Sequence, residues 1–237
     1  MATSTPNLSG LMTVLGGFLQ TILPAGVAIV QGQGNRVSEP SVPDFVVMTP
    51  ILRNRLETDV VAYADVAFTA SASGQTLSVS AVQFGQIAIG STLFGAPVAA
   101  GTTIVSGPAG GGAGSYQLSS ANNFGAQTLA AGEVTLTQPV QITVQCDVHS
   151  ANSSDAADMA ATITTLFRSA YATDTMASGS TGVWPLYADD ARQIAFTDAE
   201  QQVESRWIVD LTLQMNQAVT VAQQFAAAVS ISFVPAG

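Results

Sequence analysis

The chain has 237 residues, of which 47% are hydrophobic and only 9% charged, and its formal net charge is −10. It is long enough for one large domain or two small ones with a real core, but it lacks the densely charged surface of a typical soluble monomer, where about 25% of residues are charged. All basic residues are arginine and the chain contains no lysine. This composition argues against a DNA-binding surface in which clustered basic side chains contact phosphates. We therefore expect neighbouring subunits to cover much of the surface.

The first predicted element is an amphipathic helix near the N-terminus. Its apolar residues recur at helical spacing from Leu8 to Ile22, and Pro24 and Gly26 end the pattern. Glycines interrupt this stretch and no basic segment precedes it, so it predicts neither a signal peptide nor a membrane span. We expect the helix to cover one face of a sheet.

Three short strands are predicted after this helix. They are Val27–Val30, Phe45–Met48 and Asp59–Asp65, and each is rich in apolar residues. Gly32 and Pro40 lie in an irregular loop between the first two strands.

A stretch without any charged residue then interrupts the chain. Residues 67–132 contain no Asp, Glu, Lys or Arg and hold twelve of the 21 glycines. Apolar runs at 77–81, 87–89, 103–105 and 116–118 alternate with Gly-rich turns, which is typical of an all-β sandwich or roll. A flexible low-complexity linker is the alternative, but linkers lack this much Val, Ile and Phe. We predict a separately folded β-domain.

Strand and helix patterns return after Glu133. From residue 140 to residue 148 the apolar residues occupy even positions and the polar residues odd positions, which predicts a half-buried strand. Ser153 or Ser154 is then predicted to cap a helix whose apolar face runs as far as Ala170.

The longest alternation in the chain covers Val203–Asn216 and predicts a strand long enough to cross a whole domain. Residues 191–196 alternate too, and the polar residues after them suit a turn, so the two strands are predicted to form a hairpin. Trp207 and Leu211 of this strand and Phe167 of the preceding helix are the candidate core residues.

The last predicted elements are a short helix and a short strand. Residues 220–223 resemble a capping box, which predicts a helix from Thr220 to Phe225. Val229, Ile231 and Phe233 then alternate with serine and valine as in a strand.

These elements predict the α+β class, with an antiparallel sheet flanked by helices. The body would comprise residues 7–66 and 133–237, and residues 67–132 would form an inserted all-β domain. This division rests on the abrupt change of composition at residues 67 and 132.

Few groups in the sequence suit catalysis or metal binding. His149 has no clustered partner, and one His with one Cys cannot form a structural zinc site. Cys146 falls on the apolar side of its strand and is interpreted as a core residue. Asp189 and Asp190 have no further acidic ligand nearby, so we interpret them as a solvated hairpin entry instead of a calcium site. Gly110–Gly112 lacks the lysine and helix of a phosphate-binding loop and is predicted to form a hairpin tip. We predict no enzyme activity, cofactor or metal.

Charged residues near the predicted hairpin are the candidate interface residues. They are Arg192, Glu200, Glu204, Arg206 and Asp210. Their ion pairs could lie within the chain or across a contact between subunits, and the sequence leaves both readings open.

Several motifs in both parts of the body resemble the phage neck and tail terminator family. In the second part they are Trp184-Pro185-Leu186-Tyr187, Arg192-Gln193, Glu200-Gln201-Gln202, Arg206-Trp207, Asp210-Leu211 and Asn216. In the first part they are Gln31-Gly32-Gln33, Asn35-Arg36, Pro40, Asp44 to Pro50 and Arg53. The uncharged stretch is similar to a small β-domain inserted in many phage structural proteins, through Phe68–Ser71, Thr92–Gly95 and Ala100–Ile104.

The resemblance implies a virion structural protein. It would form a homo-oligomeric, hexameric ring that terminates the tail tube and joins it to the neck or connector proteins. DNA would pass through an acidic lumen during ejection without sequence-specific binding. The implied location is the tail or neck of the virion, after assembly in the host cytoplasm, with no membrane partner.

Two alternative functions have less support in the sequence. A receptor-binding or carbohydrate-binding decoration module would use exposed loops on the inserted β-domain, where the chief aromatic residues are Phe84, Phe94, Tyr116 and Phe124. A hydrolytic enzyme lacks the required constellation of residues.

Overall fold

The computed structural model describes residues 3–32, 40–179, 182–197 and 203–224, with the side chains at 3, 4, 195–197, 203 and 204 outside this description. The described residues form three helices and a sheet-rich fold with parallel and antiparallel strand pairs. They divide into two compact units. Of the described residues, we call 4–59 and 137–218 the body unit, and 3, 60–136 and 219–224 the β unit.

The body unit contains a mixed sheet. Its strands are β2 (Ala28–Gln31), β3 (Phe45–Arg55), β10 (Val183–Ala188), β11 (Arg192–Thr197) and parts of β9 (Phe124–Ser150) and β12 (Val203–Ala222). Strand β3 pairs with β2 on one side and β9 on the other, and β12 pairs with β9, β10 and β11. The pairing of β2 with β3 is parallel, which corrects the expectation of an antiparallel sheet. The chain between them is long enough for the crossover that a parallel pair requires.

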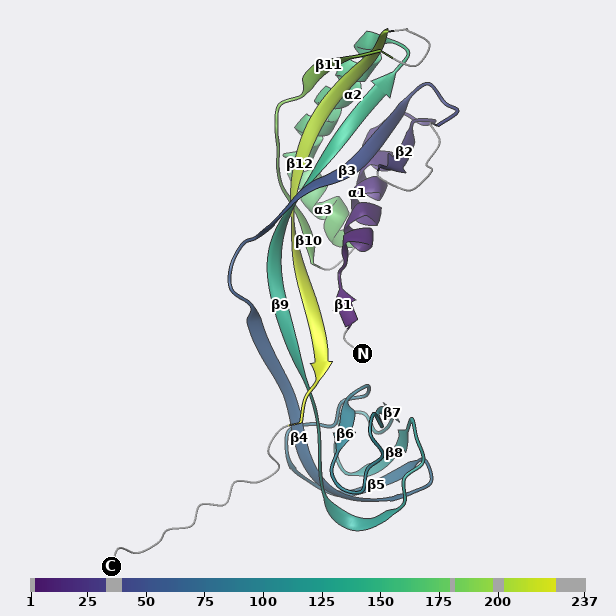
Figure 1. The fold of residues 1–237 in the computed structure, drawn as a ribbon, viewed down its shortest axis with the longest axis vertical. Helices are drawn as coiled ribbons and strands as arrows, with labels where there is room; N and C mark the ends of the chain where they lie inside the picture. The colour runs from purple at the N-terminus through teal and green to yellow at the C-terminus, as the bar shows by residue number, and fades with distance from the viewer. Residues whose placement is uncertain (1–2, 33–39, 180–181, 198–202, 225–237) are drawn as a thin grey trace, which may run out of the picture. The chain divides into compact units, whose positions relative to one another are not determined.

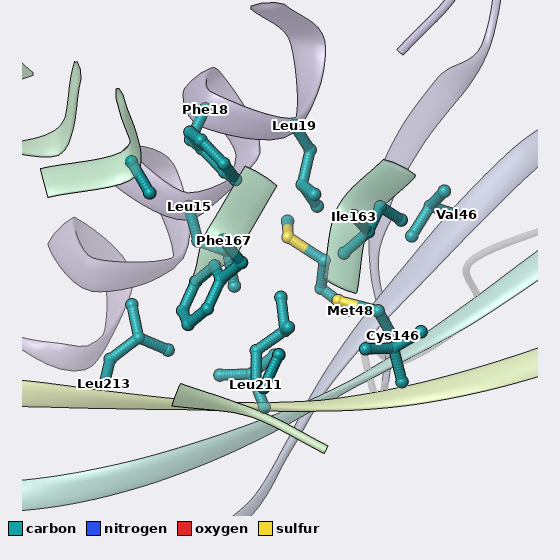
Figure 2. Close-up of a cluster of buried hydrophobic side chains, with 14 of the residues drawn as sticks. Leu15, Phe18, Leu19, Val46, Met48, Cys146, Ile163, Phe167, Leu211 and Leu213 are labelled. Atoms are coloured by element: carbon teal, nitrogen blue, oxygen red, sulfur yellow. The ribbon is translucent and has the colours of Figure 1, made fainter. Parts of the chain in front are cut away.

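Three helices pack on one face of this sheet: α1 (Leu8–Ile22), α2 (Ser153–Phe167) and α3 (Ala170–Gly179) (Figure 1). Figure 2 shows side chains of α1, α2, β3, β9 and β12 gathered in one core. Its labelled members are Leu15, Phe18, Leu19, Val46, Met48, Cys146, Ile163, Phe167, Leu211 and Leu213. The predicted helix from Leu8 to Ile22 is confirmed, while α3 was not predicted because its apolar residues form only a weak face.

The N-terminus of α2 differs from the prediction. Asn152, and neither Ser153 nor Ser154, is the N-cap, and its side chain accepts a hydrogen bond of 3.2 Å from the Ser154 N–H. Asparagine is among the best N-cap residues because its short side chain reaches the unpaired N–H groups of the first turn. The helix therefore begins one residue after Asn152.

Strand β12 confirms the predicted strand from Val203 to Asn216 and continues to Ala222. The predicted helix at 220–225 is therefore wrong for residues 220–224, none of which is helical. β-Branched residues at 219–221 favour a strand, and Thr220 shares a hydrogen bond of 3.0 Å with Thr135 of β9. Phe225 and the predicted strand at 229–233 lie outside the described residues.

The β unit has its own core, formed by strands packed around Phe68, Leu77, Ile104, Tyr116 and Leu129. Besides parts of β9 and β12, its strands are β4 (Val60–Ser73), β5 (Thr76–Phe84), β6 (Thr92–Phe94), β7 (Ile104–Ser106) and β8 (Gly114–Leu118). Strand β1 (Thr3–Thr5) is a further short strand, which pairs with β12.

Two predictions for the uncharged stretch have different outcomes. Residues 87–89 do not form a strand: the Ile87 N–H donates to the Gly111 carbonyl instead, and Ile87 is buried whereas Ile89 is exposed. Gly110–Gly112 lie between the antiparallel strands β7 and β8, so the predicted hairpin tip is confirmed. Gly110 and Gly111 both have positive φ, which glycine adopts without steric cost.

Candidate functional site

The body sheet has one face without a helix in the part of the chain that the structure describes. All three helices contribute to the core on the other side, together with even positions of β9 and odd positions of β12. The opposite positions therefore form a second surface, which we call the open face. It carries Phe45, Val47, Gln145, Asp147, His149, Tyr187, Arg192, Ile194, Arg206, Ile208, Asp210 and Thr212.

The less exposed of two ion pairs described on the open face joins Arg206 of β12 to Asp147 of β9. Both Nε and one terminal nitrogen of Arg206 donate to the same Asp147 oxygen, at 3.1 and 2.7 Å. The Asp147 side chain is 11% exposed and the Arg206 side chain 25%. An ion pair with this little solvent is less screened than a surface pair, and it holds β9 and β12 in register.

A second pair lies beside the first. Arg192 of β11 donates to Asp210 of β12 at 2.8 Å, and the Gln145 amide of β9 donates to the other Asp210 oxygen at 3.0 Å. The Asp210 carboxylate is mostly buried, whereas about half of the Arg192 side chain is exposed. The three strands are thus joined by polar contacts across their open face.

The structure describes the side chains of three of the five candidate interface residues. Arg192, Arg206 and Asp210 lie on the open face and pair within the chain. Glu200 lies outside the described residues, and so does the side chain of Glu204.

Sequence reasoning missed Asp147 and Gln145 as partners. They occupy the same alternating positions of β9 that were predicted to point away from the core. That alternation was the available signal, but only the pairing of β9 with β12 shows which strand they face.

The candidate core residues lie on the helix-covered face. Leu211 and Phe167 are fully buried, and Trp207 packs partly exposed against the same core. Burial in this core raises the pKa of the Cys146 thiol far above its ordinary value, and the neighbouring carboxylates of Asp147 and Asp210 raise it further. The thiol therefore stays protonated, which makes it a poor nucleophile.

The structure also shows what contacts His149, Asp189 and Asp190, the other polar residues that the sequence analysis discussed. His149 stacks on Phe45 of β3, with ring centroids 4.5 Å apart and planes 9° apart. Asp190 pairs with Arg168 at 3.1 Å, and the Asp189 N–H donates to the Asp210 carbonyl. Among the residues with described side chains, no group of three or more His, Cys, Asp or Glu is placed to bind a metal.

Apolar side chains are exposed next to the polar contacts. Leu186 and Tyr187 of β10 and Ile194 of β11 are exposed, and so are Ile51 and Leu52 of β3. No helix within the described ranges is long and apolar enough to cross a membrane. A sheet face with fixed charges and exposed apolar side chains is suited to contacts with other proteins.

Comparison with protein families identifies the class of protein to which the chain belongs. The profile of the phage neck terminator proteins matches residues 101–237, which is more than half of the chain. The chain belongs to this phage neck terminator family, and it is a structural protein of the phage tail or neck. The matched residues include the motifs from Trp184 to Asn216, so the resemblance found in the sequence is confirmed. Comparison with curated proteins found no match.

Proposed function

We propose that the protein forms a homo-oligomeric ring of six subunits that terminates the tail tube and joins it to neck proteins. Membership of the phage neck terminator family is the observation that carries this proposal. The ring would assemble in the host cytoplasm and remain in the virion. Its role is structural, without catalysis or a cofactor.

The open face supplies the chemistry for contacts between subunits. Interfaces are enriched in aromatic residues and arginine, and here Tyr187 and the partly exposed Arg192 lie on one surface. The ion pairs within the chain hold the arginines in place before assembly, so little side-chain entropy remains to be lost. Head-to-tail contacts of this kind close into a ring when the rotation between subunits permits it.

The charge of the chain suits a lumen through which DNA moves. The net charge is −10, and four of the arginines in the described part of the chain pair with aspartate: Arg55, Arg168, Arg192 and Arg206. Neutralised arginines contribute little to phosphate binding. DNA would therefore pass without being retained.

A matched pair of tyrosine variants tests the contact surface. Tyr187 on the open face and Tyr171 on α3 are both 48% exposed. We expect Tyr187→Asp to abolish the ring in native mass spectrometry, because it places a charge in an apolar contact, and Tyr171→Asp to leave the ring intact.

Two outcomes would overturn parts of the proposal. Wild-type protein that stays monomeric at all concentrations, with and without tail proteins, would refute the ring. A ring of the same stability in both variants would show that the open face is not the contact surface.

The alternative, a carbohydrate-binding module, receives less support from the β unit. Of its four chief aromatic residues, Tyr116 is fully buried, Phe94 and Phe124 are partly buried and only Phe84 is exposed. Glycan sites need exposed aromatic platforms, so we expect a glycan array to give no hits. A reproducible hit would favour the decoration module.

A further inference from the structure

The body unit contains a cavity of about 570 Å³, lined by the end of α1, the first turns of α2 and the residue before β3. We call it the acidic cavity. Its apolar wall includes Leu23, Val27 and Met159, and its three carboxylates are Asp44, Asp155 and Asp158. This lining suits a long cationic side chain, because the apolar wall can contact the aliphatic stem while the carboxylates accept hydrogen bonds from the charged head.

The three carboxylates have no basic partner in the part of the chain that the structure describes. Asp44 accepts a hydrogen bond of 2.6 Å from the Ser150 hydroxyl, which fixes its position but leaves its charge. Asp155 and Asp158 are three residues apart on α2, so their side chains are neighbours of the same charge. A cation in the acidic cavity would relieve this repulsion.

The end of α1 makes the acidic cavity more negative. Ile22 and Leu23, at the C-terminus of this helix, line the cavity, and the last turn of α1 contains no basic residue. A helix C-terminus carries a partial negative charge that attracts cations. The carboxylates and the helix end therefore favour the same kind of occupant.

Arg53 of β3 has the chemistry of this occupant. It is exposed, and its guanidinium donates to the side-chain oxygen of Gln217, which is neutral. The other arginines that the structure describes each pair with an aspartate. Ile51 and Leu52 beside Arg53 are 48% and 50% exposed, so a contact centred on Arg53 would also bury apolar surface.

Arg53 cannot reach the acidic cavity of its own subunit. Asp44 directly precedes β3 and Arg53 is the ninth residue of that strand, which places the two about 30 Å apart along it. No side chain spans this distance. The acidic cavity and Arg53 are thus separate surfaces of one subunit, as head-to-tail contacts between copies require.

We propose that Arg53 of each subunit inserts into the acidic cavity of the next subunit in the ring and pairs there with Asp158. This inference rests on the ring proposed above and specifies one of its contacts. Each subunit supplies one arginine and one cavity, so the contact repeats around a closed ring. The guanidinium exchanges its bond to Gln217 for charge-assisted bonds to carboxylates, which are stronger.

Charge reversal tests the contact in the full-length chain. Arg53→Glu places a negative charge against the carboxylates, and Asp158→Arg places a positive charge against Arg53. We expect either variant alone to raise the concentration for half-assembly, measured by native mass spectrometry, at least about tenfold, equivalent to about 1.4 kcal/mol. Asp158 is exposed and lies beyond the first turn of α2, so its replacement leaves the helix cap intact. Circular dichroism of each variant shows that it is folded.

Mixing the two variants distinguishes a broken pair from general damage. In an alternating assembly the introduced glutamate faces the introduced arginine, and the native Arg53 faces the native Asp158. We expect the equimolar mixture, and the double variant Arg53→Glu/Asp158→Arg, to assemble within about threefold of the wild-type concentration. The double variant Arg55→Glu/Asp158→Arg is the matched control: it makes the same charge changes, with the glutamate two residues further along β3, and should remain impaired.

The outcomes separate this inference from the proposed ring. Single variants that assemble like the wild type would refute the contact, and so would impaired variants that the charge exchange does not restore. If only one single variant is impaired, its residue pairs with another group, which also overturns the inference. In each of these cases a wild-type ring leaves the proposed function standing, whereas wild-type monomers under all conditions would refute both.

Discussion

The carboxylate of Asp147 has lost most of its contact with water, and its two hydrogen bonds from Arg206 replace the lost hydration. A buried charge is tolerated only when it is paired in this way. The exposed pair of Arg168 with Asp190 differs, because the Asp190 side chain is 93% exposed and keeps its hydration whether paired or not. Burial, more than distance, therefore distinguishes the two ion pairs.

Replacing Asp147 or Asp190 by asparagine should lower the free energy of unfolding by different amounts. We expect Asp147→Asn to lower the free energy of unfolding by about 1–3 kcal/mol, because it weakens a charge-assisted hydrogen bond and leaves Arg206 poorly paired. Asp190→Asn, the control, should cost less than about 1 kcal/mol. Urea unfolding of both variants measures the difference, and equal costs would contradict the role of burial.

Cys146 gives a pH-dependent prediction. Its pKa is raised in the folded chain, so the folded thiol stays protonated while the unfolded thiol ionises near pH 8.5. Stability is therefore fully present below that pH and falls above it, by about 1 kcal/mol between pH 8.0 and 9.5. Urea midpoints at the two pH values should show this loss in the wild-type chain. The loss should be smaller by that amount in Cys146→Ala, and identical losses would contradict the prediction.

Helix α2 shows how a single side chain determines where an element begins. The Asn152 side chain accepts from the Ser154 N–H and also from the Ser154 hydroxyl, at 3.2 and 2.9 Å. Asp155 in the first turn adds a favourable charge near the positive end of the helix. The buried side of the helix, from Ala156 to Phe167, then packs on the sheet.

Removing the cap should weaken the fold more than removing the neighbouring serine. We expect Asn152→Ala to lower the free energy of unfolding by about 0.5–2 kcal/mol, because N–H groups of the first turn lose their acceptor. Ser153→Ala is the control, with an expected effect within about 0.5 kcal/mol. Thermal and urea unfolding monitored by circular dichroism provide the measurement. A larger effect at Ser153 would restore the prediction made from the sequence.

At the scale of the whole molecule, the chain leaves the body unit at one point and returns beside it. The Gln138 amide donates to the Asp59 carboxylate at 2.9 Å, and the Leu56 N–H donates to the Pro139 carbonyl at 3.1 Å. Residues that are about 80 positions apart in sequence thus meet at the base of the insertion. This arrangement supports the proposal that the intervening residues are an inserted domain.

Excision of the intervening residues tests that proposal. Because Asp59 and Gln138 are in contact, joining Asp59 to Thr137 through a short Gly-Ser linker closes the gap without strain. We expect the shortened chain to keep its helical circular dichroism signal and to unfold cooperatively. Loss of that signal, with the full-length chain folded under the same conditions, would show that the two units depend on each other.

Much of the local structure follows from the sequence because it depends on spacing alone. Helix α1 and the alternation in β9 and β12 were predicted from which residues are apolar. The failures lie where neighbours in space compete with local preference. Residues 220–222 extend β12 because β9 lies beside them, and the Ile87 backbone pairs with Gly111 instead of a neighbouring strand.

The sequence by itself determined the family, the low surface charge and the side of each long strand that faces the core, since these depend on residue type and periodicity. Only the tertiary structure decided which charges meet. Arg206 finds Asp147, and Arg192 finds Asp210, because hydrogen bonding between strands sets a register that no local pattern contains.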